Sequence, residues 1–100
     1  MKLIVLMSMD CNREAIHKIF EEHGVHMFSE TAITGHTIST IKKYGWWPTD
    51  REASVYSTMC FALISKEKAD AIFQALEENQ KKHQREHPVR AFQVDVERMI

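Results

Sequence analysis

The first candidate binding residues are Gly35 and His36, which lie inside a run of β-branched residues. A glycine in such a run marks a backbone bulge or a place where a ligand approaches the backbone closely. The imidazole of His36 can hydrogen-bond to a ligand or coordinate a metal ion, and Thr37 adds a hydroxyl. We therefore expect ligand binding at Gly35, His36 and Thr37. The alternative is an ordinary bulge with a solvated histidine.

A second candidate is the pair of adjacent tryptophans, Trp46 and Trp47, in a segment that also carries Tyr44 and Pro48. Tryptophan is enriched in the residues that dominate binding energy at protein interfaces. Two such rings at a loop tip predict a segment that docks on a partner protein or covers a ligand. In the alternative interpretation, the rings pack on the chain's own core or on a neighbouring subunit.

Two further patterns have the spacing of metal ligands. Met7, Met9 and Cys11 alternate as M-x-M-x-C, and soft sulfur donors suit copper(I), although methionine more often fills a core. His83 and His87 lie four apart and would share one face of a helix. The glutamate of a zinc-protease helix is missing between them, which favours solvated histidines.

Composition excludes several classes of function. The net charge of −1 provides no basic field for nucleic acid. The longest uninterrupted apolar run, Leu3 to Met7, is far shorter than the roughly 20 residues of a membrane span, and the start of the chain lacks the features of a signal peptide. Two cysteines without a C-x-x-C pattern indicate reduced thiols in the cytoplasm. Without a nucleophile elbow, zinc motif or phosphate loop, we do not expect an enzyme.

The order of elements predicts how these residues are positioned. The 100 residues are enough for one domain, residues 1–100. Hydrophobic periodicity predicts the following order: strand Leu3 to Met9, helix Cys11 to His23, strand Val25 to Ser39, loop Thr40 to Glu52, strand Ala53 to Ser65, helix Lys66 to Arg85 and strand Arg90 to Glu97. This β-α-β-β-α-β order predicts an α+β, ferredoxin-like sandwich, an antiparallel four-stranded sheet with two helices on one face.

Three residues are expected to fix the ends of the helices. Asp10 has the residue type of an N-cap for the first helix. Gly24 lies where a helix commonly ends in a left-handed residue. Ser65 is the expected N-cap of the second helix.

The third predicted strand is apolar on both faces. Met59, Phe61 and Leu63 alternate with Cys60, Ala62 and other small or apolar residues. Two helices can cover only one face of the sheet, and the chain has no third layer for the other. We therefore expect subunits to cover that face for one another, which predicts a homo-oligomer.

With this order in hand, the chain resembles the PII-like signalling proteins along nearly its whole length. The opening MKLIVLMSMDCNREAIHKIFEEHGV is similar to that family's first strand and helix. ETAITGHTIS resembles the segment where its second strand enters the so-called T-loop with a glycine, and STMCFALISKEKADAIFQALEE its third strand and second helix.

The resemblance implies a trimer whose subunits hold a small-molecule effector, usually an adenine nucleotide, in clefts between them. It also implies that the T-loop, here residues 40–52, passes the bound state to an enzyme or transporter. The effector would bind near Gly35, His36, Thr37 and Arg90. The family's phosphate-wrapping glycines have no counterpart in NQKKHQREHPVR. The identity of the effector, and of any cofactor, therefore stays open, although Lys81, Lys82 and Arg85 offer side-chain contacts to an anion.

A more distant similarity to the CutA-like proteins keeps a second function open. In that interpretation the chain is a metal-binding or metal-tolerance protein, with His36 as a metal ligand beside cysteine or histidine donors. A third interpretation is an interaction subunit with no ligand at all.

Overall fold

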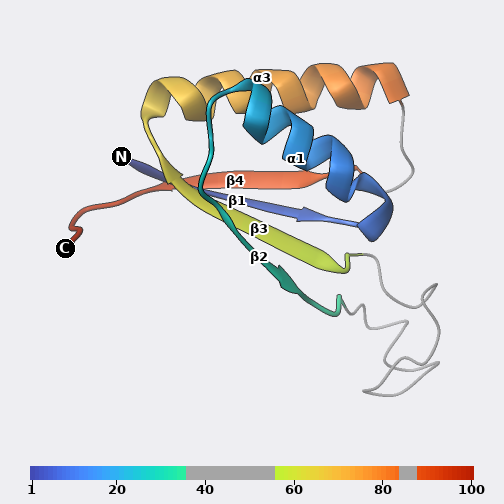
Figure 1. Cartoon of the computed structure of the whole chain (residues 1–100), viewed down its shortest axis with the longest axis horizontal. Coiled ribbons are helices and arrows are strands. Elements are labelled where there is room, and N and C mark those ends of the chain that lie inside the picture. The colour runs from blue at the N-terminus through green and yellow to red at the C-terminus, as the bar shows by residue number, and fades with distance from the viewer. Residues whose placement is uncertain (36–55, 84–87) are drawn as a thin grey trace.

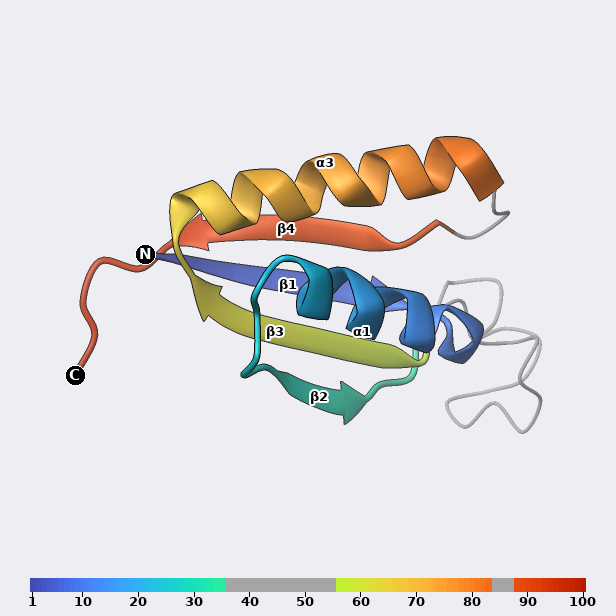
Figure 2. The same ribbon diagram turned by 45° about the horizontal axis from the view of Figure 1, so that its top comes forward.

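Strands and helices follow one another in the predicted order (Figure 1). The computed structural model describes residues 1–35, 56–83 and 88–100. Its elements are β1 (Lys2–Ser8), the 3-10 turn η1 (Asp10–Asn12), α1 (Arg13–Glu22), β2 (Ser29–Ala32), β3 (Thr58–Ile64), α3 (Lys66–His83) and β4 (Arg90–Asp95). The strands form one antiparallel sheet in the order β2-β3-β1-β4, and both helices cover the same face (Figures 1 and 2). The predicted α+β, ferredoxin-like fold is confirmed.

The core lies between the helices and the helix-facing side of the sheet. The central strand β1 pairs with β3 on one side and β4 on the other, as its continuous apolar run predicts. Because side chains alternate along a strand, Ile4 and Leu6 both point at the helices and are 0% exposed. They pack with residues spaced three or four apart on the helices and with alternate residues of β3: Ile16, Ile19, Phe20, Ala69, Ile72, Cys60, Ala62 and Ile64.

Glycine ends α1 as predicted. Gly24 has φ 72°, and the N–H of Val25 donates to the carbonyl of Phe20 at 2.8 Å while the N–H of Gly24 donates to Glu21 at 3.2 Å. This pair of bonds is a Schellman motif, which satisfies the last helical carbonyls. At the start of α3, the Ser65 hydroxyl accepts the N–H of Lys68 at 3.3 Å, which confirms that cap.

The expectation for Asp10 is wrong. Asp10 lies inside η1, and the N-cap position of α1 is Asn12, which makes no side-chain cap bond. The Asp10 carboxylate instead accepts hydrogen bonds from the hydroxyls of Thr58 (2.7 Å) and Ser57 (3.0 Å). Two hydroxyls from the chain entering β3 therefore take the role that the helix N–H groups were expected to have.

The first strand has its predicted length, shifted by one residue to Lys2–Ser8, whereas the described part of the second contains less strand than predicted. Of the predicted strand from Val25 to Ser39, the described residues 25–35 contain the four residues of β2, and the part beyond residue 35 lies outside the described residues. Residues 25–28 do not form strand because they carry the chain from the helix layer down to the sheet (Figure 1). Val25 is buried in the core, and the ring of Phe28 packs on Phe20 with centroids 4.9 Å apart.

Smaller differences concern the ends of the other elements. The helix predicted from Cys11 begins as the turn η1 and becomes α-helical at Arg13. Strand β3 begins at Thr58, two residues into the described part of the predicted strand, while residues 53–55 lie outside the described residues. Strand β4 ends at Asp95 rather than Glu97. The described part of α3 ends at His83.

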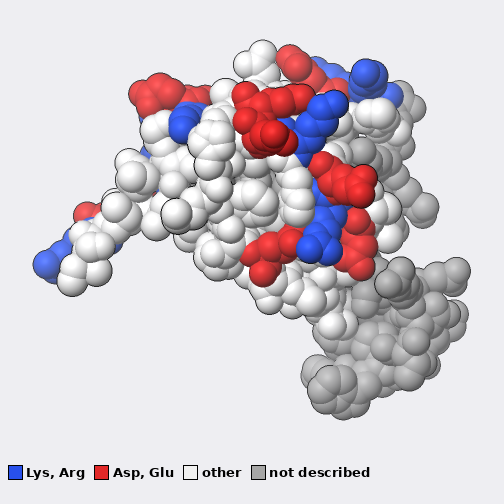
Figure 3. All heavy atoms as spheres, in the orientation of Figure 1, with Lys and Arg blue, Asp and Glu red and all other residues white. Residues whose placement is uncertain are grey.

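The second face of the sheet carries no helix and is apolar. Register places its side chains opposite one another: Val5 lies between Phe61 and Phe92, and Leu3 between Leu63 and Val94. Phe61 is 37% exposed, Phe92 47%, and Leu63 and Val94 49% each. We call these residues with Met7 and Met59 the open face. On the side of the molecule seen in Figure 3, charged side chains gather over the two helices. The prediction that β3 is apolar on both faces is confirmed, and the apolar side of β4 also belongs to the open face.

Candidate functional site

At one end of the sheet, Tyr56 contacts both described residues of the predicted effector site, which lie at the ends of the two outer strands β2 and β4. The N–H of Gly35 donates to the backbone carbonyl of Tyr56 at 3.2 Å. The hydroxyl of Tyr56 donates to the carbonyl of Pro88 at 3.1 Å and accepts Nε of Arg90 at 3.2 Å. Tyr56 therefore bridges Gly35 and Arg90, which lie far apart in the sequence.

Strand register explains why Gly35, Tyr56 and Arg90 lie at the same end of the sheet. Thr58, at the start of β3, lies opposite both Ala32 at the end of β2 and Ser8 at the end of β1. Arg90, at the start of β4, lies opposite Met7. β1 and β2 therefore end, and β3 and β4 begin, at the same end of the sheet. The chain leaves the described residues after Gly35 and returns to them at Tyr56 at this end, with residues 36–55 between. Two bonds close the base of that segment, Gly35 to Tyr56 and the N–H of Ile33 to the carbonyl of Ser57 at 2.9 Å.

The other predicted site residues cannot be placed. His36 and Thr37 of the effector site, and Tyr44, Trp46 and Trp47 of the predicted docking loop, lie outside the described residues. The role of His36 as a metal ligand therefore stays a prediction, as does the docking role of the tryptophans. Tyr56 was predicted only as a strand residue. Its role as a bridge depends on its reach across the end of β1, for which local sequence holds no signal.

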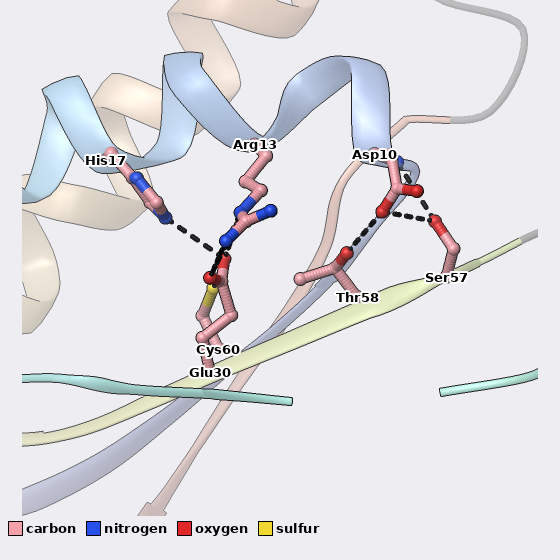
Figure 4. Close-up of polar contacts among 7 residues, drawn as sticks. All are labelled: Asp10, Arg13, His17, Glu30, Ser57, Thr58 and Cys60. Carbon is pink, nitrogen blue, oxygen red and sulfur yellow. Dashed lines mark hydrogen bonds and ion pairs between the residues drawn. The ribbon is translucent and has the colours of Figure 1, made fainter. Parts of the chain in front are cut away.

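A second polar group lies between α1 and the sheet (Figure 4). The carboxylate of Glu30 on β2 accepts a hydrogen bond from Nε of Arg13 at 3.0 Å and pairs with Nη2 of the same guanidinium at 2.8 Å. Nε2 of His17 lies 3.0 Å from Oε1 of Glu30, and the thiol of Cys60 on β3 donates to the same oxygen at 3.5 Å. Side chains from α1 and β3 thus converge on one carboxylate of β2. We call His17, Glu30 and Cys60, with Arg13, the Glu30 cluster.

Burial and hydrogen bonding set the charges of the Glu30 cluster. Burial alone would raise the pKa of the Glu30 carboxyl, but hydrogen bonds from His17 and Arg13 together hold it below its usual value. Burial, followed by the neighbouring Glu30 carboxylate, raises the pKa of the Cys60 thiol to about 12. Cys60 is therefore a protonated thiol at neutral pH and has no thiolate to act as a nucleophile.

A shallow pocket joins the Glu30 cluster to Asp10. It measures about 330 Å³ and is lined by Asp10, Arg13, Glu30, Thr31, Ala32 and Thr58. Thr58 is buried and donates to Asp10, so this wall of the pocket is fixed by bonds between β3 and η1. The lining suits binding of a polar or cationic group rather than attack on a substrate.

The sulfur pattern is spread over two surroundings in the described chain, and the histidine pair is only half described. Met7 lies on the open face rather than in the core, because its register partners are Met59 and Arg90. Cys11 is exposed in η1, and His83 is exposed at the end of α3, with His87 outside the described residues.

The Glu30 cluster was missed by sequence reasoning. Glu30 and Cys60 meet because they are opposite one another in the β2–β3 register, and His17 reaches them from α1. No spacing along the chain indicates this meeting, since its members lie on three separate elements.

No described helix is both long and apolar enough to cross a bilayer. No protein-family model matches the chain, and no curated protein matches it in sequence.

Several solved structures match it in fold. A putative PII-like signalling protein from Thermus thermophilus superposes with a TM-score of 0.67 at 19% identity, over 95% of this chain and 84% of that one. A DUF3240 family protein from Shewanella baltica gives 0.67 at 17% identity, over 98% and 91% of the two chains.

The third similar protein is CPII from Thiomonas intermedia, a nitrogen regulatory PII-like protein. Its apo form gives a TM-score of 0.67 at 12% identity, over 95% of this chain and 87% of that chain. Its form bound to ADP, AMP and bicarbonate gives 0.63 at 13% identity, over 99% and 94%. Matches of this quality over nearly the whole chain, at such low identity, lead to one conclusion about its architecture: the chain is a divergent example of the PII-like fold.

Proposed function

We propose that the chain is a PII-like regulatory protein, not an enzyme, that senses a small molecule in the cytoplasm. The observation that carries the proposal is the Tyr56 bridge between Gly35 and Arg90. It lies at the base of residues 36–55, where an effector can act on both ends of that segment. The shared fold supports the proposal, since CPII has been solved with ADP, AMP and bicarbonate.

The chemistry of this edge favours an anionic effector. Tyr56 holds Nε of Arg90 at 3.2 Å and so orients the guanidinium, a group suited to phosphate or carboxylate. Gly35 has no side chain, so a ligand can come close to its backbone. His36 and Thr37 follow directly in the sequence. An adenine nucleotide is the effector class that we propose.

The open face supports a proposal of subunit assembly. A hollow of about 530 Å³ lies on it, lined by residues that include Leu3, Met27, Phe61 and Leu63. Burying such a surface between chains gives the hydrophobic free energy that one chain leaves unused. We propose a homotrimer, with the effector in the clefts between subunits.

Residues 40–52 would carry the signal to a partner, such as a transporter or an enzyme. Tyr44, Trp46 and Trp47 would supply the contacts. The effector shifts the equilibrium of this segment only if it binds one of its states more tightly than the other.

Calorimetric titration with ADP, AMP, ATP and bicarbonate tests the effector site. We expect the wild type to bind at least one adenine nucleotide and Arg90→Gln to bind it about tenfold more weakly or worse, the loss expected for a charge-assisted contact. Arg98→Gln, which removes an equal charge outside the sheet, is the matched control and should bind as the wild type does. Unchanged affinity in Arg90→Gln, or no binding by the wild type, would refute the proposed site.

A pull-down with candidate partners tests the docking loop separately. Replacing Trp46 and Trp47 with Ala should abolish partner capture and leave effector affinity unchanged. Loss of both partner capture and the circular dichroism of the fold would instead assign the rings a structural role.

A further inference from the structure

The Glu30 cluster has no part in the proposed effector site, yet it gathers three metal-binding groups. One ligand atom each of His17, Glu30 and Cys60 lies within 4.8 Å of the others. They come from α1, β2 and β3, so the fold itself brings them together (Figure 4).

The present distances are close to those around a bound zinc ion. Zinc binds histidine nitrogen and carboxylate oxygen at about 2.0–2.1 Å and thiolate sulfur at about 2.3 Å, so tetrahedral ligand atoms lie about 3.3–3.6 Å apart. Here the nitrogen of His17 and the sulfur of Cys60 lie 3.0 and 3.5 Å from the same Glu30 oxygen. The third pair, the nitrogen of His17 and the sulfur of Cys60, lies within 4.8 Å, so side-chain shifts of about 1 Å would be enough to admit the ion.

The donor set also selects the kind of ion. Zinc accepts imidazole, carboxylate and thiolate together, whereas magnesium and calcium prefer oxygen ligands alone. Three protein donors leave a fourth position for water. His17 is 38% and Glu30 19% exposed, so an ion can enter from the surface, while Cys60 forms the floor at 1% exposure.

Arg13 is the group that competes with a cation at Glu30. Its guanidinium contacts both carboxylate oxygens, and its positive charge opposes that of an ion. Its side chain is 53% exposed, so it can turn into water when an ion replaces its charge at Glu30.

We propose that His17, Glu30 and Cys60 form a binding site for one zinc ion, which displaces Arg13 from Glu30. On binding, the thiol of Cys60 gives its proton to solvent and the sulfur takes the metal in its place. The bound ion would link the edge strand β2 to α1 and β3, close in sequence to Gly35. This site does not depend on the proposed effector function.

Cobalt(II) titration followed by absorption tests the proposal, with zinc chloride calorimetry for affinity. Under reducing conditions, the wild type should bind one cobalt ion and show a thiolate-to-cobalt charge-transfer band. Cys60→Ser should lose the band, and His17→Gln should bind zinc about tenfold more weakly or worse. The matched controls Cys11→Ser and His23→Gln, which change the other described cysteine and a histidine at the end of α1, should behave as the wild type does.

Arg13→Gln distinguishes a metal site from a purely structural ion-pair group. Removing the competing charge should tighten zinc binding several-fold. Weaker binding in Arg13→Gln, a charge-transfer band that survives in Cys60→Ser, or no cobalt bound by the wild type would overturn the proposal. His17 and Arg13 are both partly exposed on α1, so these two variants keep the test valid if Cys60→Ser does not fold.

Discussion

The two faces of β3 carry similar side chains but meet different surroundings. Cys60, Ala62 and Ile64 are 1%, 4% and 6% exposed beneath the helices. Phe61 and Leu63, which alternate with them, are 37% and 49% exposed. Residue type does not distinguish the faces, whereas the presence of a covering layer does. The comparison teaches that the helices of one chain cover only one of the two apolar faces of the sheet. We therefore propose that other subunits cover the second face.

The largest effect is expected on the covered face. Ile4→Ala removes a side chain that is 0% exposed and should lower the free energy of unfolding by about 2–5 kcal/mol. Urea denaturation measures this loss. Met99→Ala, at a side chain that is 62% exposed, is the control and should change stability by less than about 0.5 kcal/mol. Similar losses in both variants would contradict the location of the core.

A charge on the open face should act on assembly rather than on folding. Leu63→Glu should raise the dissociation constant of the oligomer about thirtyfold or more, equivalent to ~2 kcal/mol. Its circular dichroism should stay that of the wild type. Sedimentation at several protein concentrations measures the change, and Lys18→Glu, on an exposed position of α1, is the control. If Leu63→Glu assembles like the wild type, the open face is not the interface.

A smaller effect is expected at the polar end of the covered face. Thr58→Val removes the hydroxyl that donates to Asp10 at 2.7 Å and should lower the free energy of unfolding by about 1 kcal/mol. The remaining bond from Ser57 limits the loss. Thr31→Val, on the exposed edge strand β2, should change stability by less than about 0.5 kcal/mol. Thermal unfolding measures the stability of both variants. A larger loss of stability in Thr31→Val than in Thr58→Val would contradict the role given to the Thr58–Asp10 hydrogen bond.

The smallest effect is expected at the opposite end of the sheet, where Lys2 of β1 lies opposite Asp95 of β4. Lys2 hydrogen-bonds to Asp95, and this contact together with its positive charge lowers the pKa of the Asp95 carboxyl. Because the pKa is lowered, the pair's contribution to the free energy of unfolding is fully present above the usual Asp pKa. That contribution is lost as pH falls through the lowered pKa. Asp95→Asn should therefore differ slightly from the wild type in thermal unfolding at pH 7 and not at all in strong acid. A difference that grows on acidification would have the wrong sign.

The fold could be predicted because its signals are local. The apolar run of β1, the helical spacing of Ile16, Ile19 and Phe20, and the glycine that ends α1 each act within a few residues. The length of β2 could not be predicted in this way. β-branched residues indicated a long strand, but residues 25–28 must first cross from the helix layer to the sheet.

The sites divide in the same way. Gly35 was predicted as a site residue because a glycine in a strand pattern is a local signal, and Arg90 was predicted through the family resemblance; binding at both stays a prediction. The Glu30 cluster was missed because it depends on register: Glu30 faces Cys60 only once β2 and β3 are aligned. The reach of Tyr56 across the sheet's edge is also a tertiary property.

Native mass spectrometry of the wild type with and without ADP, AMP and ATP tests the central claim most directly. We predict the mass of three chains, with nucleotide bound to that assembly and not to single chains. A single chain at micromolar concentration that binds none of the three nucleotides would contradict both proposals: burial of the open face between subunits, and an effector site in the clefts between them.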